Sequence, residues 1–376
     1  MRPFLVTTLL LVRASSAFAH AISDDFTLGA TQATSTNPSS WFLSDRVGGV
    51  AELGEKLTLR LDTTYTYDAP TPPPAGANFR NDGGNIFLLN LSADWQATRR
   101  FSFYVGGSYS PPSTTSTDTS VDITVSGKDG EKTESTDAQL SSRSQSGGGS
   151  IGASFDTDGE SNAETTVDAS IGANYYDSTQ QLTAFWSKIQ NRVIPASQYQ
   201  QYCDSHKATL TPRQASLCNL AAPHQYGLLQ LRFNAAITET LYDNTDLGLS
   251  ATYYLYNQDP TQVGYYSKTV TGRTDRPPSS TDFGGGMPVA AYWYSLAPSL
   301  THRFGKFSTG MSLQFAQYVS APGEGFSYDL MLGIKLQYKF NSHFRLWLKG
   351  NGQRDVDSTG TSSISGWLTL GAKYIF

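Results

Sequence analysis

The sequence predicts an all-β fold, an antiparallel up-and-down transmembrane β-barrel. Runs of residues alternate between apolar and polar with the period of two of a β-strand, and the apolar parity is rich in Leu, Phe and Tyr. No stretch approaches the roughly 18 uncharged apolar residues of a membrane-spanning helix. The 376 residues include 34 Gly and 21 Tyr, but only 16% are charged. This composition is expected when strand residues face water and lipid in turn.

The N-terminus is typical of a secretory signal peptide. Arg2 gives a short positive start, Leu5–Val12 is an apolar run, and Ala17-Phe18-Ala19 is a small-x-small cleavage pattern. We expect residues 1–19 to be removed on export. Residues 20–47 are expected to form a periplasmic or plug segment ahead of the barrel, which is predicted over 48–376.

About twelve strands are predicted within 48–376, an even number as bacterial single-chain barrels require. Each is an alternating run bounded by Gly, Pro, Asn, Asp or Ser. The expected strands are 50–67, 85–96, 100–110, 146–157, 163–176, 225–238, 245–257, 288–304, 307–320, 326–340, 343–353 and 363–376. A count of about 14 is the alternative if Val121–Val125 pairs with a neighbouring strand.

The connections between these strands alternate in length. Short turns such as Gly305-Lys306 alternate with long connections, as expected for periplasmic turns and outer loops. The long connections include 68–84, 111–145, 177–224 and 258–286. The tract Ser113–Gly149 is rich in Ser, Thr, Asp and Gly and is expected to be a mobile outer loop. The alternation holds if 177–224 is one extracellular insertion, so we expect Gln181–Val193 to be a loop or a short helix.

The last predicted strand carries Tyr374 and Phe376 on its apolar parity. An aromatic terminus of this kind resembles the C-terminal strand of Gram-negative outer-membrane β-barrels, in which it is the assembly signal. The resemblance implies residence in the bacterial outer membrane and closure of the last strand against the first. It also implies outer-membrane lipid, lipopolysaccharide and the barrel assembly machinery as partners.

Charged residues on the polar parity are predicted to line the lumen. Those on the earlier strands are Arg60, Asp62, Asp94, Asp168, Arg232 and Asp246, and those on the last three strands are Lys335, Lys339, Arg345, Lys349 and Lys373. We expect an acidic wall facing a basic one, with Lys373 near Arg60 or Asp62 after closure. Aromatic residues of the same parity are expected to narrow the bore; they are Tyr104, Tyr226, Tyr254, Tyr256 and Trp347.

Cys203 and Cys218, the only cysteines, both lie in the 177–224 insertion. An exported protein meets an oxidising compartment, so a disulfide between them is predicted. It would stabilise the fold by about 3 kcal/mol by limiting the unfolded state. Such a bridge would staple the loop, or hold it as a cap or gate over the pore.

Catalytic and metal-binding patterns are not evident in the sequence. His302 and His343 fall at a strand end and in a turn, and no nucleophile elbow at a strand-to-helix junction is evident. Asp156-Thr157-Asp158-Gly159-Glu160 contains part of a calcium-loop pattern but fits a tight turn better. We therefore expect no enzyme activity, no cofactor and no metal.

The function predicted from these features is an outer-membrane channel for passive diffusion of small hydrophilic solutes. Charged lumen residues would set its selectivity. The charges could instead pair across the lumen and fill it as a polar core, since the predicted strand count lies between filled and open barrels. The alternatives are a non-conducting barrel that displays loops for adhesion or scaffolding, and an outer-membrane hydrolase. The net charge of −5 argues against a nucleic-acid partner.

Overall fold

The structure is a computed structural model that describes residues 21–31, 41–70, 79, 84–127, 130–157, 163–187, 191–206, 209, 223–242, 244–258, 291–319 and 325–375. The predicted signal peptide and Phe376 lie outside these residues. Within them, no helix has the length and apolar character needed to cross a membrane.

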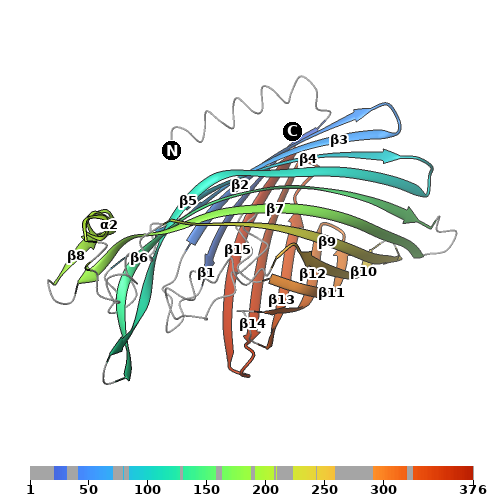
Figure 1. Cartoon of the computed structure of the whole chain (residues 1–376). Coiled ribbons are helices and arrows are strands. Elements are labelled where there is room, and N and C mark those ends of the chain that lie inside the picture. The colour runs from blue at the N-terminus through green and yellow to red at the C-terminus, as the bar shows by residue number, and fades with distance from the viewer. Residues whose placement is uncertain are drawn as a thin grey trace.

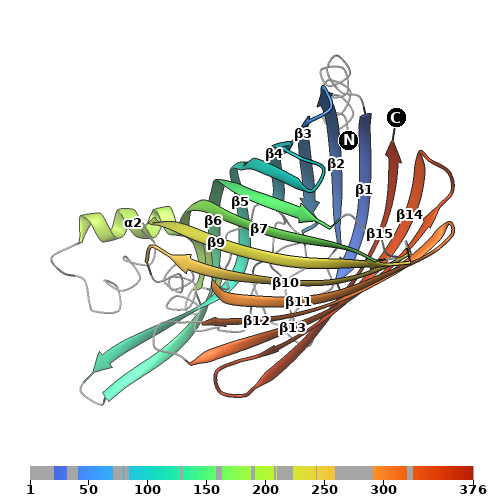
Figure 2. The same ribbon diagram turned by 90° about the vertical axis from the view of Figure 1, so that its right-hand side faces the viewer.

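The strands form one antiparallel sheet that closes into a barrel (Figures 1 and 2). In chain order they are β1 Ala21–Thr31, β2 Trp41–Leu53, β3 Leu57–Asp68, β4 Gly84–Gln96, β5 Phe101–Gly127, β6 Gly130–Asp156, β7 Ala163–Ser187, β8 Arg192–Pro195, β9 His224–Leu241, β10 Thr245–Tyr256, β11 Ala291–Phe304, β12 Phe307–Val319, β13 Phe326–Lys339, β14 Phe344–Val356 and β15 Ser362–Ile375. Fourteen of them make the wall, and β8 is a short extra strand paired with β7. The wall closes where β1 pairs with β15.

The prediction of about twelve strands is wrong, and the alternative of fourteen is correct in number. The two additional strands are β1 and β2, so most of the segment 20–47 is barrel wall rather than a periplasmic or plug segment. Val121–Val125 does pair, but only within the β5–β6 hairpin, and adds no strand. The alternation is hard to see in β1 and β2 because Asp24, Asp45 and Gly49 interrupt the parity that carries Phe26 and Leu43.

Two segments expected to be loops are strands. β5 and β6 are 27 residues each, so most of 111–145 is a two-stranded ribbon that projects beyond the barrel (Figure 2). β7 continues through Ser187 and pairs with β6 as far as Phe185, so Gln181–Ser187 is strand rather than loop or helix. Register shifts between Ser110 and Ser113 and between Gln139 and Leu140 accompany the exit of the ribbon from the wall.

The predicted alternation of short and long connections still holds, because β1 and β2 add a pair of consecutive strands and leave the order of the later connections unchanged. Residues 54–56, 97–100, 157–162, 242–244, 305–306 and 340–343 join strands at one rim, which we call the turn end. The connections that include 188–223 and 257–290 join strands at the other rim, which we call the loop end. Both β1 and β15 have their free termini at the turn end.

The only helix among the described residues, α2 (Ala196–Ser205), follows β8 at the loop end. Its Cys203 is buried and is not a free thiol. Cys218, the predicted partner, lies outside the described residues, so the pairing stays a prediction.

Candidate functional site: the inner wall of the barrel

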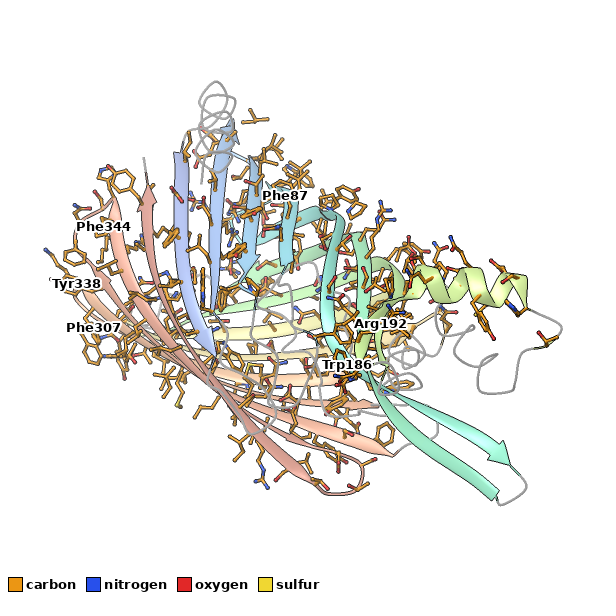
Figure 3. All side chains as sticks on the ribbon, turned by 90° about the vertical axis from the view of Figure 1, so that its left-hand side faces the viewer. Phe87, Trp186, Arg192, Phe307, Tyr338 and Phe344 are labelled. Atoms are coloured by element: carbon orange, nitrogen blue, oxygen red, sulfur yellow. The ribbon has the colours of Figure 1, made fainter. Side chains whose placement is uncertain are left out.

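Cross-strand register identifies the two faces of the wall. Large exposed apolar side chains share one parity on each strand, for example Leu330, Leu332 and Ile334 on β13. Their register partners on β12 and β14 belong to the same face. The residues between them therefore point into the lumen, as the sequence pattern predicts. At the turn end, Phe307, Tyr338 and Phe344 gather as an aromatic rim (Figure 3).

The inner face of β2–β4 carries charges in compensating pairs. Arg46 Nη2 lies 3.1 Å from Asp62 Oδ2, and Arg60 Nη1 lies 3.5 Å from Asp94 Oδ2. We call these four residues the paired wall. An acidic wall was predicted here, and that expectation is wrong because Arg46 lies on β2, which the sequence did not reveal as a strand. Asp246 is likewise neutralised by Arg303 of β11.

The inner face of β13–β15 carries five cations, which we call the basic wall: Lys335, Lys339, Arg345, Lys349 and Lys373. Lys339, Arg345 and Lys373 are direct cross-strand neighbours, and Lys335 is opposite Lys349. Like charges that face each other across a sheet destabilise it. In the described part of the chain, no ion pair involves Lys335, Lys339, Arg345 or Lys373.

Asp25 separates the two walls. It is opposite Lys373 of β15 on one side and Arg46 of β2 on the other. The prediction that Lys373 would approach Arg60 or Asp62 is therefore wrong, because β1 and β2 lie between them. Asp25 is the acidic neighbour of the basic wall across the seam.

Trp347 of β14 lies within the basic wall. The Lys335 Nζ atom is 5.5 Å from the centre of its ring, a cation–π distance. The ring lies over Gly371, where an added Cβ would be 2.2 Å from ring atoms. Trp347 is thus held flat against the wall beside the cations.

The remaining predicted lumen charges are on β7 and β9. Asp168 and Arg232 share the inner face but are two inward positions apart in the register. Arg232 is exposed to the lumen, with its Nη2 atom close to the backbone of Gly172. They do not belong to either wall.

A hydrogen-bonded belt crosses the inner face nearer the loop end. Tyr176 donates to Gln230 at 3.4 Å, Gln230 donates to Tyr256 at 3.1 Å, and Tyr256 donates to the Tyr292 carbonyl at 2.8 Å. Tyr292 in turn donates to Asp329 Oδ2 at 3.1 Å, and Asp329 is only 1% exposed. These residues, from β7, β9, β10, β11 and β13, are called the tyrosine belt.

Tyr292 reaches this belt because of an irregularity in β11. The sequence parity groups Tyr292 with the outward Tyr294 and Leu296. A register shift between Tyr292 and Tyr294 places Tyr292 opposite the inward Tyr318 instead. A β-bulge reverses the facing of residues beyond it, which period-two reasoning cannot detect.

The two histidines considered as catalytic candidates, His302 and His343, have hydrogen-bond partners within the barrel. His302 Nδ1 is 2.7 Å from Thr245 Oγ1, and His343 Nδ1 is 2.8 Å from the Ile375 carbonyl. Among the described residues, no group of three or more His, Cys, Asp or Glu side chains is placed to hold a metal.

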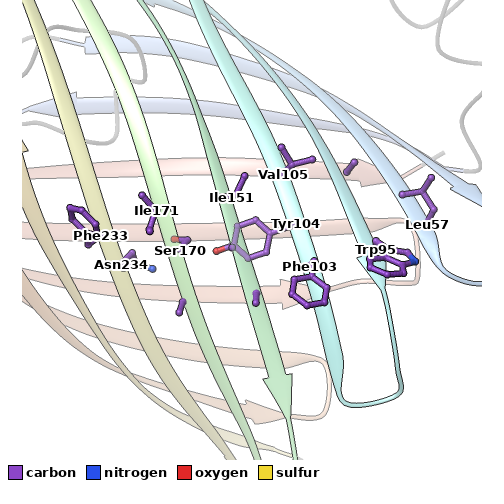
Figure 4. A pocket seen from close by; sticks show the side chains of 14 residues that line it. Leu57, Trp95, Phe103, Tyr104, Val105, Ile151, Ser170, Ile171, Phe233 and Asn234 are labelled. Carbon is purple, nitrogen blue, oxygen red and sulfur yellow. The ribbon is translucent and has the colours of Figure 1, made fainter.

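An apolar hollow of about 790 Å³ lies along β3–β9 (Figure 4). Most of its lining belongs to the outward parity, including Trp95, Phe103 and Phe233. Small residues such as Ala153 and Ala169 also line it. The hollow belongs to the apolar outer face rather than to the charged lumen.

Comparison with known proteins supports the class of fold. No family model and no curated protein matches the sequence. Among solved structures, the chain is similar to the CymD monoaromatic hydrocarbon channel, with a TM-score of 0.50, 11% identity, and coverage of 96% of this chain and 90% of that one. It is also similar to the Pseudomonas putida toluene transporter TodX, with a TM-score of 0.49, 10% identity, and coverage of 95% and 89%. The chain has the fold of the outer-membrane β-barrel proteins, without assignment to a specific family within them.

Proposed function

We propose that this protein is an outer-membrane channel for passive diffusion of small hydrophilic solutes. The observation that carries the proposal is a closed wall of fourteen strands whose inner face is charged. Eight-stranded barrels are filled by side chains, whereas barrels of about 16–18 strands leave an aqueous channel. Fourteen strands lie nearer the open case than the twelve expected from sequence.

The chemistry of the lumen favours polar solutes. The similar structure with a TM-score of 0.50 is a hydrocarbon channel by name, but at 11% identity the likeness concerns the fold. In this chain the inner face carries the basic wall, the paired wall and the tyrosine belt. Desolvating these charges for an apolar solute would cost free energy, whereas a water-filled path leaves them hydrated.

Several further expectations accompany the channel. We expect residence in the bacterial outer membrane, with the turn end in the periplasm after removal of residues 1–19. Tyr374 and Phe376 would provide the signal for the barrel assembly machinery, and lipid and lipopolysaccharide would cover the outer face. A Cys203–Cys218 disulfide would staple the segment after β7, and no catalysis is expected.

The test is conductance in planar bilayers. We expect stepwise ohmic currents from purified protein in KCl. Bilayers that stay sealed at high protein, with the barrel shown to be folded by its β-sheet circular dichroism, would contradict the proposal. The projecting β5–β6 ribbon would then favour the surface-display alternative. Binding to cells or matrix that is lost when 113–144 is deleted would support that alternative.

A further inference from the structure

We infer that the basic wall is an anion-binding subsite of the lumen that takes the carboxylate of a small organic anion. The inference rests on the proposed function, since the anion reaches the wall through the lumen. It concerns three adjacent strands at the seam, β13–β15, and the Trp347 ring that lies among their cations.

The first argument is the placement of like charges. Arg345 has Lys339 on one side and Lys373 on the other, each directly opposite in register. Lys335 is opposite Lys349, and it lies within electrostatic range of Asp25 as well as of Lys349, Lys373 and Arg345. At the seam, Asp25 is the acidic residue opposite Lys373, and no described carboxylate forms an ion pair with Lys335, Lys339, Arg345 or Lys373. A bound anion would relieve their repulsion, because opposite charges within about 4–6 Å stabilise each other.

The second argument is that other cations in the same lumen are neutralised by carboxylates of the chain. Arg46, Arg60 and Arg303 each have a carboxylate within ion-pair distance. The chain therefore provides acidic partners on β3, β4 and β10. Among the described residues, the inner face of β14 carries Asp355, but it lies opposite Asp329 near the loop end and not beside Arg345. The Nε atom of Arg345 is buried and has no hydrogen-bond partner.

The third argument is the chemistry of the donors. A guanidinium group presents a planar fork that matches a carboxylate, whereas lysine ammonium groups act as mobile point charges. Arg345 supplies the fork, and Lys335 and Lys373 supply the surrounding charge. Trp347 adds an apolar surface beside them, which suits an organic anion.

Two variants isolate the charge of the inner face. Arg345→Gln combined with Lys335→Gln removes two cations of the basic wall. Arg354→Gln combined with Lys306→Gln removes two cations outside the lumen, because Arg354 is exposed on the outward parity of β14 and Lys306 lies in a turn. The net charge change is the same in both variants.

The first measurement is the reversal potential in a KCl gradient. We expect the native channel to be selective for chloride over potassium. Each cation removed in the inner variant should lower this selectivity about fourfold, because a unit charge about 5 Å away in water changes the free energy of an ion by that factor. Acetate should lower the chloride current of the native channel more than acetamide does, and this difference should vanish in the inner variant. A cation preference, or equal changes in both variants, would overturn the inference.

The second measurement does not require conductance. In detergent, the fluorescence of Trp347 is isolated by difference from a Trp347→Phe variant. Iodide should quench it more strongly than caesium, Lys335→Gln should remove the difference, and Lys306→Gln should leave it. Equal quenching by the two ions would overturn the inference. Sealed bilayers with preferential iodide quenching would reject the channel and retain the anion subsite.

Discussion

Arg46 and Arg345 occupy equivalent places on the two walls of the barrel, but their surroundings differ. Arg46 has Asp25 opposite it on β1 and Thr64 opposite it on β3, and its Nη2 atom lies 3.1 Å from Asp62, so its charged neighbours are acidic. Arg345 has Lys339 and Lys373 opposite it, so both of its neighbours are basic. An arginine on the inner face thus stabilises the paired wall by ion pairing, whereas on the basic wall it is repelled by its neighbours. A bound anion would reduce this repulsion.

The largest expected effect comes from packing within the two walls. Gly371→Ala would place a Cβ 2.2 Å from the Trp347 ring, and overpacking of this kind costs about 1–3 kcal/mol of unfolding free energy. Gly48→Ala on the paired wall would meet the terminal oxygen of Asp62, which can rotate away, and should cost less. Urea unfolding followed by tryptophan fluorescence provides the comparison.

Gly352→Ala is the control for this packing test, since nothing lies within 4 Å of its added Cβ. It should leave the unfolding free energy unchanged or slightly raised. If Gly371→Ala were as harmless as Gly352→Ala, Trp347 would not lie against the wall as described.

The tyrosine belt offers a carboxylate that is partnered by a neutral donor rather than by an arginine. Tyr292→Phe removes the hydroxyl that donates to the buried Asp329. We expect a loss of about 1–2 kcal/mol of unfolding free energy. Tyr294→Phe, at an exposed outward position on the same strand, is the matched control and should change little. Equal losses would show that Tyr292 does not point inward.

The electrostatic effects of the basic wall and of the paired wall should differ in their dependence on salt concentration. The screening length falls from about 10 Å at 0.1 M to about 3 Å at 1 M. Anion preference that arises from several cations around the bore should therefore decline over this range, whereas the close Arg46–Asp62 pair should be less affected. Reversal potentials at both salt concentrations measure this decline. A preference that does not change with salt would point to a steric origin.

The smallest effect concerns a carboxylate outside the wall. Hydrogen bonds from the Thr359 side chain and from nearby backbone amides lower the pKa of Asp357 from its usual 3.8. A lowered folded pKa gives stability that is present above the unfolded pKa and is lost as pH falls through the folded value. The melting-temperature advantage over Asp357→Asn should therefore be present at neutral pH and shrink below pH 3.8. An advantage that grows in acid would contradict this assignment.

Much of the wall could be predicted from sequence because lipid on one side and water on the other impose a period of two. β9, β10 and β13–β15 show this alternation clearly, and the lengths of the connections give the correct order of turns and loops. β1 and β2 could not be recognised in this way. Asp24 and Asp45 occupy positions on their outward parity, where an apolar residue is expected.

The cross-strand neighbours of a residue were harder to predict from sequence than whether its side chain faces the lumen or the lipid. Parity assigns Lys373 to the lumen, but its neighbour depends on which strand closes the barrel. Because the sequence pattern does not reveal β1 and β2, it makes β3 the first strand and predicts Asp62 beside Lys373, where the structure has Asp25. Tyr292 required knowledge of a bulge. Arg303 lies next to His302 on the predicted parity, so its inward position could have been found; its pairing with Asp246 follows from the register of β10 and β11.

The most direct test of the contrast between the walls is the same substitution made at Arg46 and at Arg345. Arg46→Gln leaves Asp62 without its partner, and should lower the free energy of unfolding by about 0.5–1 kcal/mol, since the pair is partly exposed. Arg345→Gln removes repulsion from Lys339 and Lys373, and should raise it by about 0.5 kcal/mol. Urea unfolding of the two variants at low salt should give changes of opposite sign. Changes of the same sign would contradict the division of the lumen into a paired wall and a basic wall.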